Sequence, residues 1–148
     1  MAADAARTLR AAAEVFVPGP PHDATPGAAD VEAERFIVHY LDYMIPGLSA
    51  GVPDLLDGLA AERFGDTPFA DLGLDERRAV LAALESHEVE QLRELPTVIG
   101  LLAIAAVYSE WTGQDAQGGL TRRPLGWRLS GFDGPSRGRR GLLREEGS

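Results

Sequence analysis

Residues 98–108 read Val-Ile-Gly-Leu-Leu-Ala-Ile-Ala-Ala-Val-Tyr, a run of 11 positions without a charged side chain. A helix that is apolar on every side is usually covered by other parts of its protein. The run is also much shorter than the roughly 20 residues that a helix needs to cross a bilayer. We therefore predict a buried helix over about residues 97–111, and no membrane span.

The chain before this run is predicted to be helical as well. Alanine and leucine, the best helix formers, supply most of its apolar content. Apolar residues recur at helical spacing, and the periodic segments end near proline or glycine. The predicted helices cover about residues 3–16, 27–45, 53–63 and 76–94.

Two of these predicted helices carry long apolar stripes. The stripe of the helix over 27–45 comprises Val31, Phe36, Ile37, Tyr40, Leu41, Met44 and Ile45. The buried side of the helix over 76–94 is predicted to hold Val80, Leu81, Leu84, Val89 and Leu92.

From residue 112 onward the chain is rich in glycine and has no helical period. Its closing segment, residues 125–135, places Trp127 and Phe132 among three glycines. We expect this arm to be a loop, with room for one short turn. The predicted fold is therefore all-α, a small bundle of about five helices with a long irregular C-terminal arm. Residues 1–135 are predicted to form a single helical domain that includes the arm, 112–135, and residues 136–148 a flexible basic tail.

Charge and cysteine content exclude several classes of function. Residues 1–97 hold 18 acidic residues and 7 arginines, a net −11, while residues 98–148 hold 5 and 7, a net +2. An acidic body argues against nucleic-acid binding, which needs a basic face. The absence of cysteine excludes disulfides, thiolate metal sites and covalent c-type haem attachment. The first residues do not resemble a signal peptide, so we expect a cytoplasmic location.

No arrangement of side chains predicts catalysis. His22, His39 and His87 are not spaced as metal ligands, and no H-E-x-x-H frame is present. No serine lies in a G-x-S-x-G turn, and no G-x-G-x-x-G follows a strand. We therefore predict that this chain has no catalytic, cofactor-binding or metal-binding residue and is not an enzyme by itself.

The most unusual side chains near the C-terminus are aromatic. They are either anchors of the chain's own core or contacts with a partner, because Trp, Tyr and Arg concentrate binding energy at protein interfaces. If a partner binds here, the predicted contacts are Tyr108, Trp111, Trp127, Arg128 and Phe132.

Three separated groups of motifs resemble a known family over about residues 9–135. The first is Val17-Pro18-Gly19 with Thr25-Pro26-Gly27-Ala28-Ala29-Asp30-Val31 leading to Phe36, and the second is Phe69-Ala-Asp-Leu72 followed by residues 76–85. The third is 97–110 with the Gly-Trp-x-x-x-Gly-aromatic-x-Gly-Pro ending at 126–135, which is the most specific. Together they resemble the small subunit of membrane-bound gluconate 2-dehydrogenase, the subunit 3 family.

The resemblance implies a non-catalytic small subunit without a cofactor of its own. Its partner would be a large FAD-binding oxidoreductase of the glucose–methanol–choline type, acting on a sugar, a glycoside or another alcohol. Typical members begin with a twin-arginine export signal, which this chain lacks. Either the complex is cytoplasmic, or the leader lies on the partner or has been removed. The alternative is a free-standing helical binding or scaffold module with no flavoenzyme partner.

Overall fold

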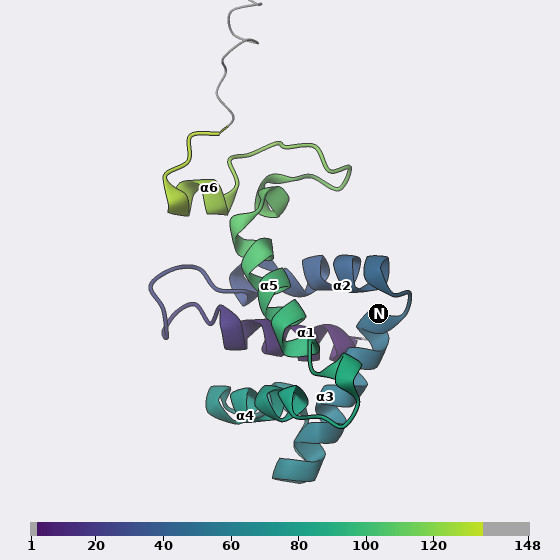
Figure 1. Ribbon diagram of the computed structural model, residues 1–148. Helices are drawn as coiled ribbons and strands as arrows, with labels where there is room; N and C mark the ends of the chain where they lie inside the picture. Colours follow the sequence, from purple (N-terminus) through teal and green to yellow (C-terminus); the bar gives the residue numbers. More distant parts are fainter. Residues whose placement is uncertain (1–2, 135–148) are drawn as a thin grey trace, which may run out of the picture. The chain divides into compact units, whose positions relative to one another are not determined.

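The computed structural model describes residues 3–134, in which every regular element is helical apart from one β-bridge between Gln114 and Leu120 (Figure 1). The predicted all-α class is confirmed. The helices are α1 (Ala3–Phe16), α2 (Ala33–Met44), α3 (Leu48–Phe64), α4 (Leu74–Glu85), α5 (Leu95–Tyr108) and α6 (Leu125–Ser130). Short 3₁₀ turns are η1 (Ala29–Val31), η2 (Phe69–Asp71), η3 (Glu90–Leu92) and η4 (Glu110–Gly113).

The chain divides into an N-terminal unit, which ends at Val107, and a C-terminal unit, which begins at Tyr108. We describe each unit by itself, and the single domain over 1–135 stays a prediction. The predicted basic tail, 136–148, lies outside the described residues.

Helix α1 is the centre of the N-terminal unit. It contacts α2, α3 and α4, and lies between α2 and α4 in Figure 1. Its alanines allow this close packing, because a methyl side chain keeps neighbouring backbones near one another. The fully buried side chains include Leu9, Ile37, Leu41, Leu56, Phe69, Val80, Leu84 and Ile99. These residues come from α1 to α5 and η2, so the five helices of the unit and η2 all contribute side chains to its core.

Helix α5 is held in the unit along one side. Ile99, Ala103, Ala106 and Val107 are buried there. Gly100 lies on the same side, and a Cβ at that position would be 2.9 Å from the ring of Phe16. The glycine therefore makes room for an aromatic ring from the end of α1.

Helix α2 begins later than predicted, at Ala33 instead of about residue 27. The chain before it forms a closed loop, in which Val17 O accepts from Ala28 N at 2.8 Å. At the base of this loop a Cβ on Gly19 would be 2.6 Å from Gly27 N, so the two backbones are in direct contact. Glu32, with φ 51°, adopts the left-handed conformation and separates η1 from α2.

Helix α4 ends at Glu85, although periodicity predicts a helix to about residue 94. After the helix, His87 Nδ1 accepts from Val89 N at 3.1 Å, and His87 O accepts from Arg93 Nε at 2.7 Å. These local bonds form a turn in which Val89 is exposed. The prediction that Val89 lies on the buried side is therefore wrong.

Candidate functional site

The three histidines serve structural roles or lie in solvent. Among residues 3–134 no group of three or more His, Asp or Glu side chains is placed to hold a metal ion. His87 stabilises the turn after α4, His39 packs edge-on against Tyr40, and His22 is exposed. The three histidines therefore do not form a common metal site.

Buried charges connect helices of the N-terminal unit. Glu34, only 3% exposed, forms an ion pair with Arg10, which joins α2 to α1. Arg77 of α4 donates to Glu14 at 2.9 Å and to Ala70 O at 2.7 Å. Each pair bridges two elements of the core, so we assign these charges to the stability of the unit.

The turn after α2 is fixed by one carboxylate. Asp42 Oδ1 accepts from Ser49 N at 3.0 Å, and Asp42 Oδ2 accepts from Ser49 Oγ at 2.8 Å. These bonds satisfy one of the free N–H groups at the start of α3. The bond from the backbone N–H of Ser49 is the main cause of a lowered pKa of Asp42, and the bond from the Ser49 hydroxyl adds to it. Both favour the ionised carboxylate.

The C-terminal unit is built around two close backbone approaches. A Cβ on Gly126 would be 2.1 Å from Tyr108 O, and one on Gly113 would be 2.5 Å from Arg122 O. Thr112 Oγ1 accepts from Leu125 N at 2.7 Å and so caps the start of α6. The segment predicted to be loop thus contains a six-residue helix, stabilised by a residue 13 positions away.

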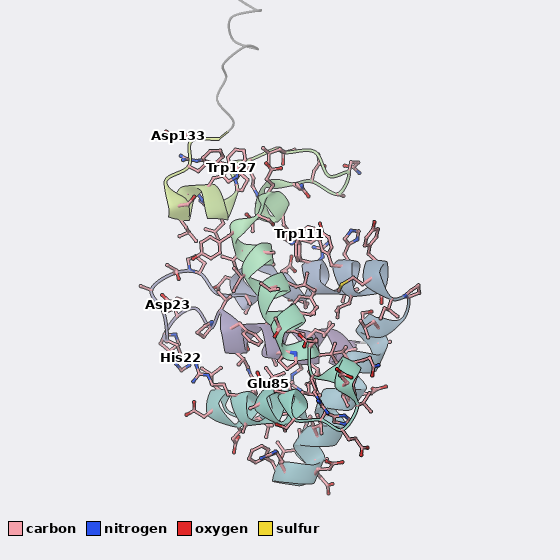
Figure 2. The ribbon with its side chains drawn as sticks, viewed as in Figure 1. His22, Asp23, Glu85, Trp111, Trp127 and Asp133 are labelled. Carbon is pink, nitrogen blue, oxygen red and sulfur yellow. The ribbon has the colours of Figure 1, made fainter. Side chains whose placement is uncertain are left out.

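The aromatic arm packs partly on itself. The rings of Trp127 and Phe132 meet edge to face, with their centroids 5.2 Å apart. Arg123 Nη2 donates to Phe132 O at 2.7 Å and to Asp133 Oδ1 at 3.3 Å, which closes the arm over α6. Figure 2 shows Trp127 and Asp133 beside α6. The arm therefore has an internal core, although Phe132 remains 47% exposed.

The structure brings together only part of the predicted interface. Trp127 and Phe132 are in contact. The backbone of Tyr108 lies against Gly126 of α6, the residue before Trp127 in the sequence. Trp111 is in η4, half-buried and apart from Trp127 in Figure 2, while Arg128 is exposed. No partner chain tests these five residues as contacts, so the assignment stays a prediction.

Sequence reasoning missed two exposed apolar surfaces. One is on α5, where Leu101 is 63% and Ile104 is 46% exposed. The other is at the end of α2, where Tyr43 is 82% exposed and Tyr40, Met44 and Ile45 are also exposed. Of the stripe predicted for 27–45, Phe36, Ile37 and Leu41 are the members that are buried. The signal for α5 was present in the sequence, since a helix with apolar residues on all sides has no side suited to water.

By length and composition, the stretch Glu90–Gly113 is apolar enough to cross a membrane. This is weak evidence, because core helices pass the same test, and 39% of its most apolar window is buried within the chain.

These observations define a class of protein: a small all-α chain whose notable surfaces are apolar and whose described residues hold no metal cluster. The chain belongs to the gluconate 2-dehydrogenase subunit 3 family, whose model matches residues 3–134. The resemblance seen in the motifs is thereby confirmed, and the chain is of a kind that serves as a subunit of a dehydrogenase complex. No curated protein and no solved structure is significantly similar to it.

Proposed function

We propose that this chain is the non-catalytic small subunit that binds and stabilises a large oxidoreductase. The partner is an FAD-dependent enzyme of the glucose–methanol–choline type, which oxidises a sugar, a glycoside or another alcohol. The observation that carries the proposal is the family match over residues 3–134, nearly the whole chain. FAD is bound by the partner, and this chain carries no cofactor.

The proposed contacts in the C-terminal unit are Tyr108, Trp111, Trp127, Arg128 and Phe132. The half-exposed ring of Phe132 and the exposed side chain of Arg128 support this, because aromatic and arginine side chains are enriched in interface hot spots. We propose a cytoplasmic complex in which this chain does not cross a membrane. Fractionation of the native cells tests that location, and recovery from the periplasm or the membrane would contradict it.

The experiment is to tag this chain at its own locus, purify it from its native host and record the visible spectrum. The expected result is a stoichiometric large subunit with flavin absorption bands that bleach when a sugar or alcohol substrate is added. A colourless preparation without a large subunit would reject the proposal. Capture of a protein without flavin would not support it.

The free-standing helical module remains a second candidate, since Trp127 and Phe132 pack on one another within the chain. It predicts a colourless monomer in the same purification. A double variant, Trp127→Ala with Phe132→Ala, separates the roles further. If the arm is an interface, the variant chain keeps the helical content of the N-terminal unit but loses the flavoprotein. Unchanged complex formation would remove the arm from the interface.

A further inference from the structure

The outer side of α5, which we define by Thr97, Leu101 and Ile104, has an unusual composition. All three residues are exposed, whereas Ile99 and Ala103 of the same helix are fully buried. The helix contains no charged residue from Leu95 to Tyr108. Its outer side therefore meets solvent through a threonine and two large aliphatic side chains.

Helix α4 of the same unit has a polar outer side instead. On α4 the exposed residues include Asp75, Glu76, Arg78 and Glu85. Single exposed apolar residues are common and need no explanation. Two large ones at i and i+3 on a helix without any charge form a surface that water solvates poorly. A helix that is apolar on all sides is normally covered on all sides.

We propose that the outer side of α5 is a docking surface for the catalytic subunit of the dehydrogenase complex. The inference rests on the proposed function and locates a contact on the N-terminal unit, in addition to the aromatic residues of the C-terminal unit. Positions 97, 101 and 104 follow the i, i+4, i+7 spacing by which a helix inserts side chains into an apolar groove. The same helix ends at Tyr108, a residue already proposed to contact the partner.

Charge favours a different subunit over a second copy of this chain. The N-terminal unit, up to Val107, holds 18 acidic residues and 7 arginines, a net −11, because residues 98–107 carry no charge. Two such units would each carry this net negative charge, and repulsion between like charges opposes their association. A catalytic subunit with a neutral or basic rim around an apolar groove has no such cost.

The same charge disfavours a lipid surface, since anionic headgroups repel an acidic protein. Helix α5 itself has 14 residues, which corresponds to about 21 Å of helix, less than the roughly 30 Å of a bilayer core. The longer apolar stretch Glu90–Gly113 includes the 3₁₀ turns η3 and η4 at its ends. Its inner side is also occupied by core contacts, including the Phe16 ring on Gly100. A protein groove therefore fits the exposed half of this helix better than a bilayer does.

The absence of cysteine from the chain allows a direct test. Leu101→Cys and Ile104→Cys each introduce a single thiol on the outer side of α5, and Ala82→Cys introduces a control thiol on an exposed position of α4. The alkylation rate of each thiol with a maleimide is measured by mass spectrometry on this chain, alone and in the purified complex. In the complex we expect at least about tenfold slower reaction at 101 and 104, because a buried thiol reacts only from the dissociated fraction. The control thiol should react equally in both.

Each outcome decides the matter. Slower alkylation at 101 and 104 in the complex, with the control unchanged, supports the inference. Equal rates in the free chain and in an intact flavoprotein complex overturn it and leave the proposed function standing. Failure to obtain any flavoprotein rejects both proposals. Concentration-dependent protection in the isolated chain assigns the surface to a second copy, and protection by phosphatidylcholine vesicles assigns it to lipid; both overturn the inference.

A charge substitution gives an independent readout. Ile104→Glu should lower the yield of co-purified flavoprotein by about tenfold or more, since an apolar groove would have to bury a carboxylate. The matched variant Ala82→Glu places the same side chain on α4 and should leave the yield unchanged. The helical circular dichroism of both isolated variants should equal that of the parent chain. Full retention of the flavoprotein by a folded Ile104→Glu chain would contradict the inference.

Discussion

Helices α4 and α5 belong to the same unit and each buries one side, but their outer sides differ. Helix α4 buries Val80 and Leu84 and exposes charged residues, including an Arg78–Asp75 ion pair at 2.9 Å. Helix α5 buries Ile99 and Ala103 and exposes Leu101 and Ile104. The inner sides show that both helices are parts of the folded core. The outer sides show that one of them is adapted to water, and we infer that the other is adapted to a protein surface.

The largest expected effects come from the inner sides, where the two helices should behave alike. Leu84→Ala on α4 and Ile99→Ala on α5 each remove a fully buried side chain. Each should lower the free energy of unfolding by about 2–5 kcal/mol, from lost apolar burial and the cavity left behind. Urea denaturation followed by circular dichroism measures this loss. A cost well below 1 kcal/mol for Ile99→Ala alone would show that α5 is not part of the core.

The sequence predicts which residues form the buried side of a helix better than it predicts the character of the exposed side. Helix α1 matches its predicted bounds, because Leu9, Ala12 and Ala13 define one face and Pro18 follows the helix. For α5 the apolar residues surround the helix, so periodicity contains no information about which side is covered. That side is decided by tertiary contacts such as the Phe16 ring on Gly100.

Two further features were missed: a short helix stabilised by a residue 13 positions away, and an early helix end stabilised by local hydrogen bonds. Helix α6 has six residues, too few to show a period, and its first N–H is capped by Thr112. The early end of α4 depends on the hydrogen bonds of His87, which hydrophobic periodicity does not report. For Trp127 and Phe132 the sequence left two alternatives, a place in the chain's own core or a contact with a partner. The structure shows that the two rings meet each other, and the partner contact stays a prediction.

The second prediction concerns the C-terminal unit. A Cβ on Gly126 would be closer to its nearest neighbour, at 2.1 Å, than a Cβ on Gly100 of α5 would be to the Phe16 ring, at 2.9 Å. Gly126→Ala places a methyl carbon only 2.1 Å from Tyr108 O. The resulting overpacking should lower the free energy of unfolding by about 1–3 kcal/mol. Both tryptophans, Trp111 and Trp127, belong to this unit, so tryptophan fluorescence reports its unfolding separately from the helical signal. The control, Gly58→Ala in α3, has open space and should be neutral or stabilising. Equal behaviour of the two variants would contradict the close approach in the C-terminal unit.

The third prediction compares, through pH, a carboxylate that fixes a turn with a carboxylate on the outer side of α4. Asp42 is hydrogen-bonded by Ser49, and its pKa is lowered, so the folded state binds its proton more weakly than the unfolded state does. Its contribution to stability is therefore complete above the unfolded pKa of about 4 and is lost as the pH falls through the lower folded value. Asp42→Asn should flatten the acid limb of a stability–pH curve. Asp75→Asn, at an exposed ion pair on α4, should change that limb less, because exposed pairs contribute little. An identical acid limb for both variants would refute the role of Asp42.

The smallest effects are expected on the outer sides, measured in the isolated chain. Arg78→Gln on α4 and Leu101→Gln on α5 should each change the free energy of unfolding by no more than about 0.5 kcal/mol, because neither exposed side chain fills the core. Glutamine is a good helix former in both places, so helix propensity does not separate them. The two variants should differ only when the catalytic subunit is present, where Leu101→Gln weakens the complex and Arg78→Gln does not. A large loss of stability for Leu101→Gln in the free chain would instead make Leu101 a core residue, and the contrast between α4 and α5 would disappear.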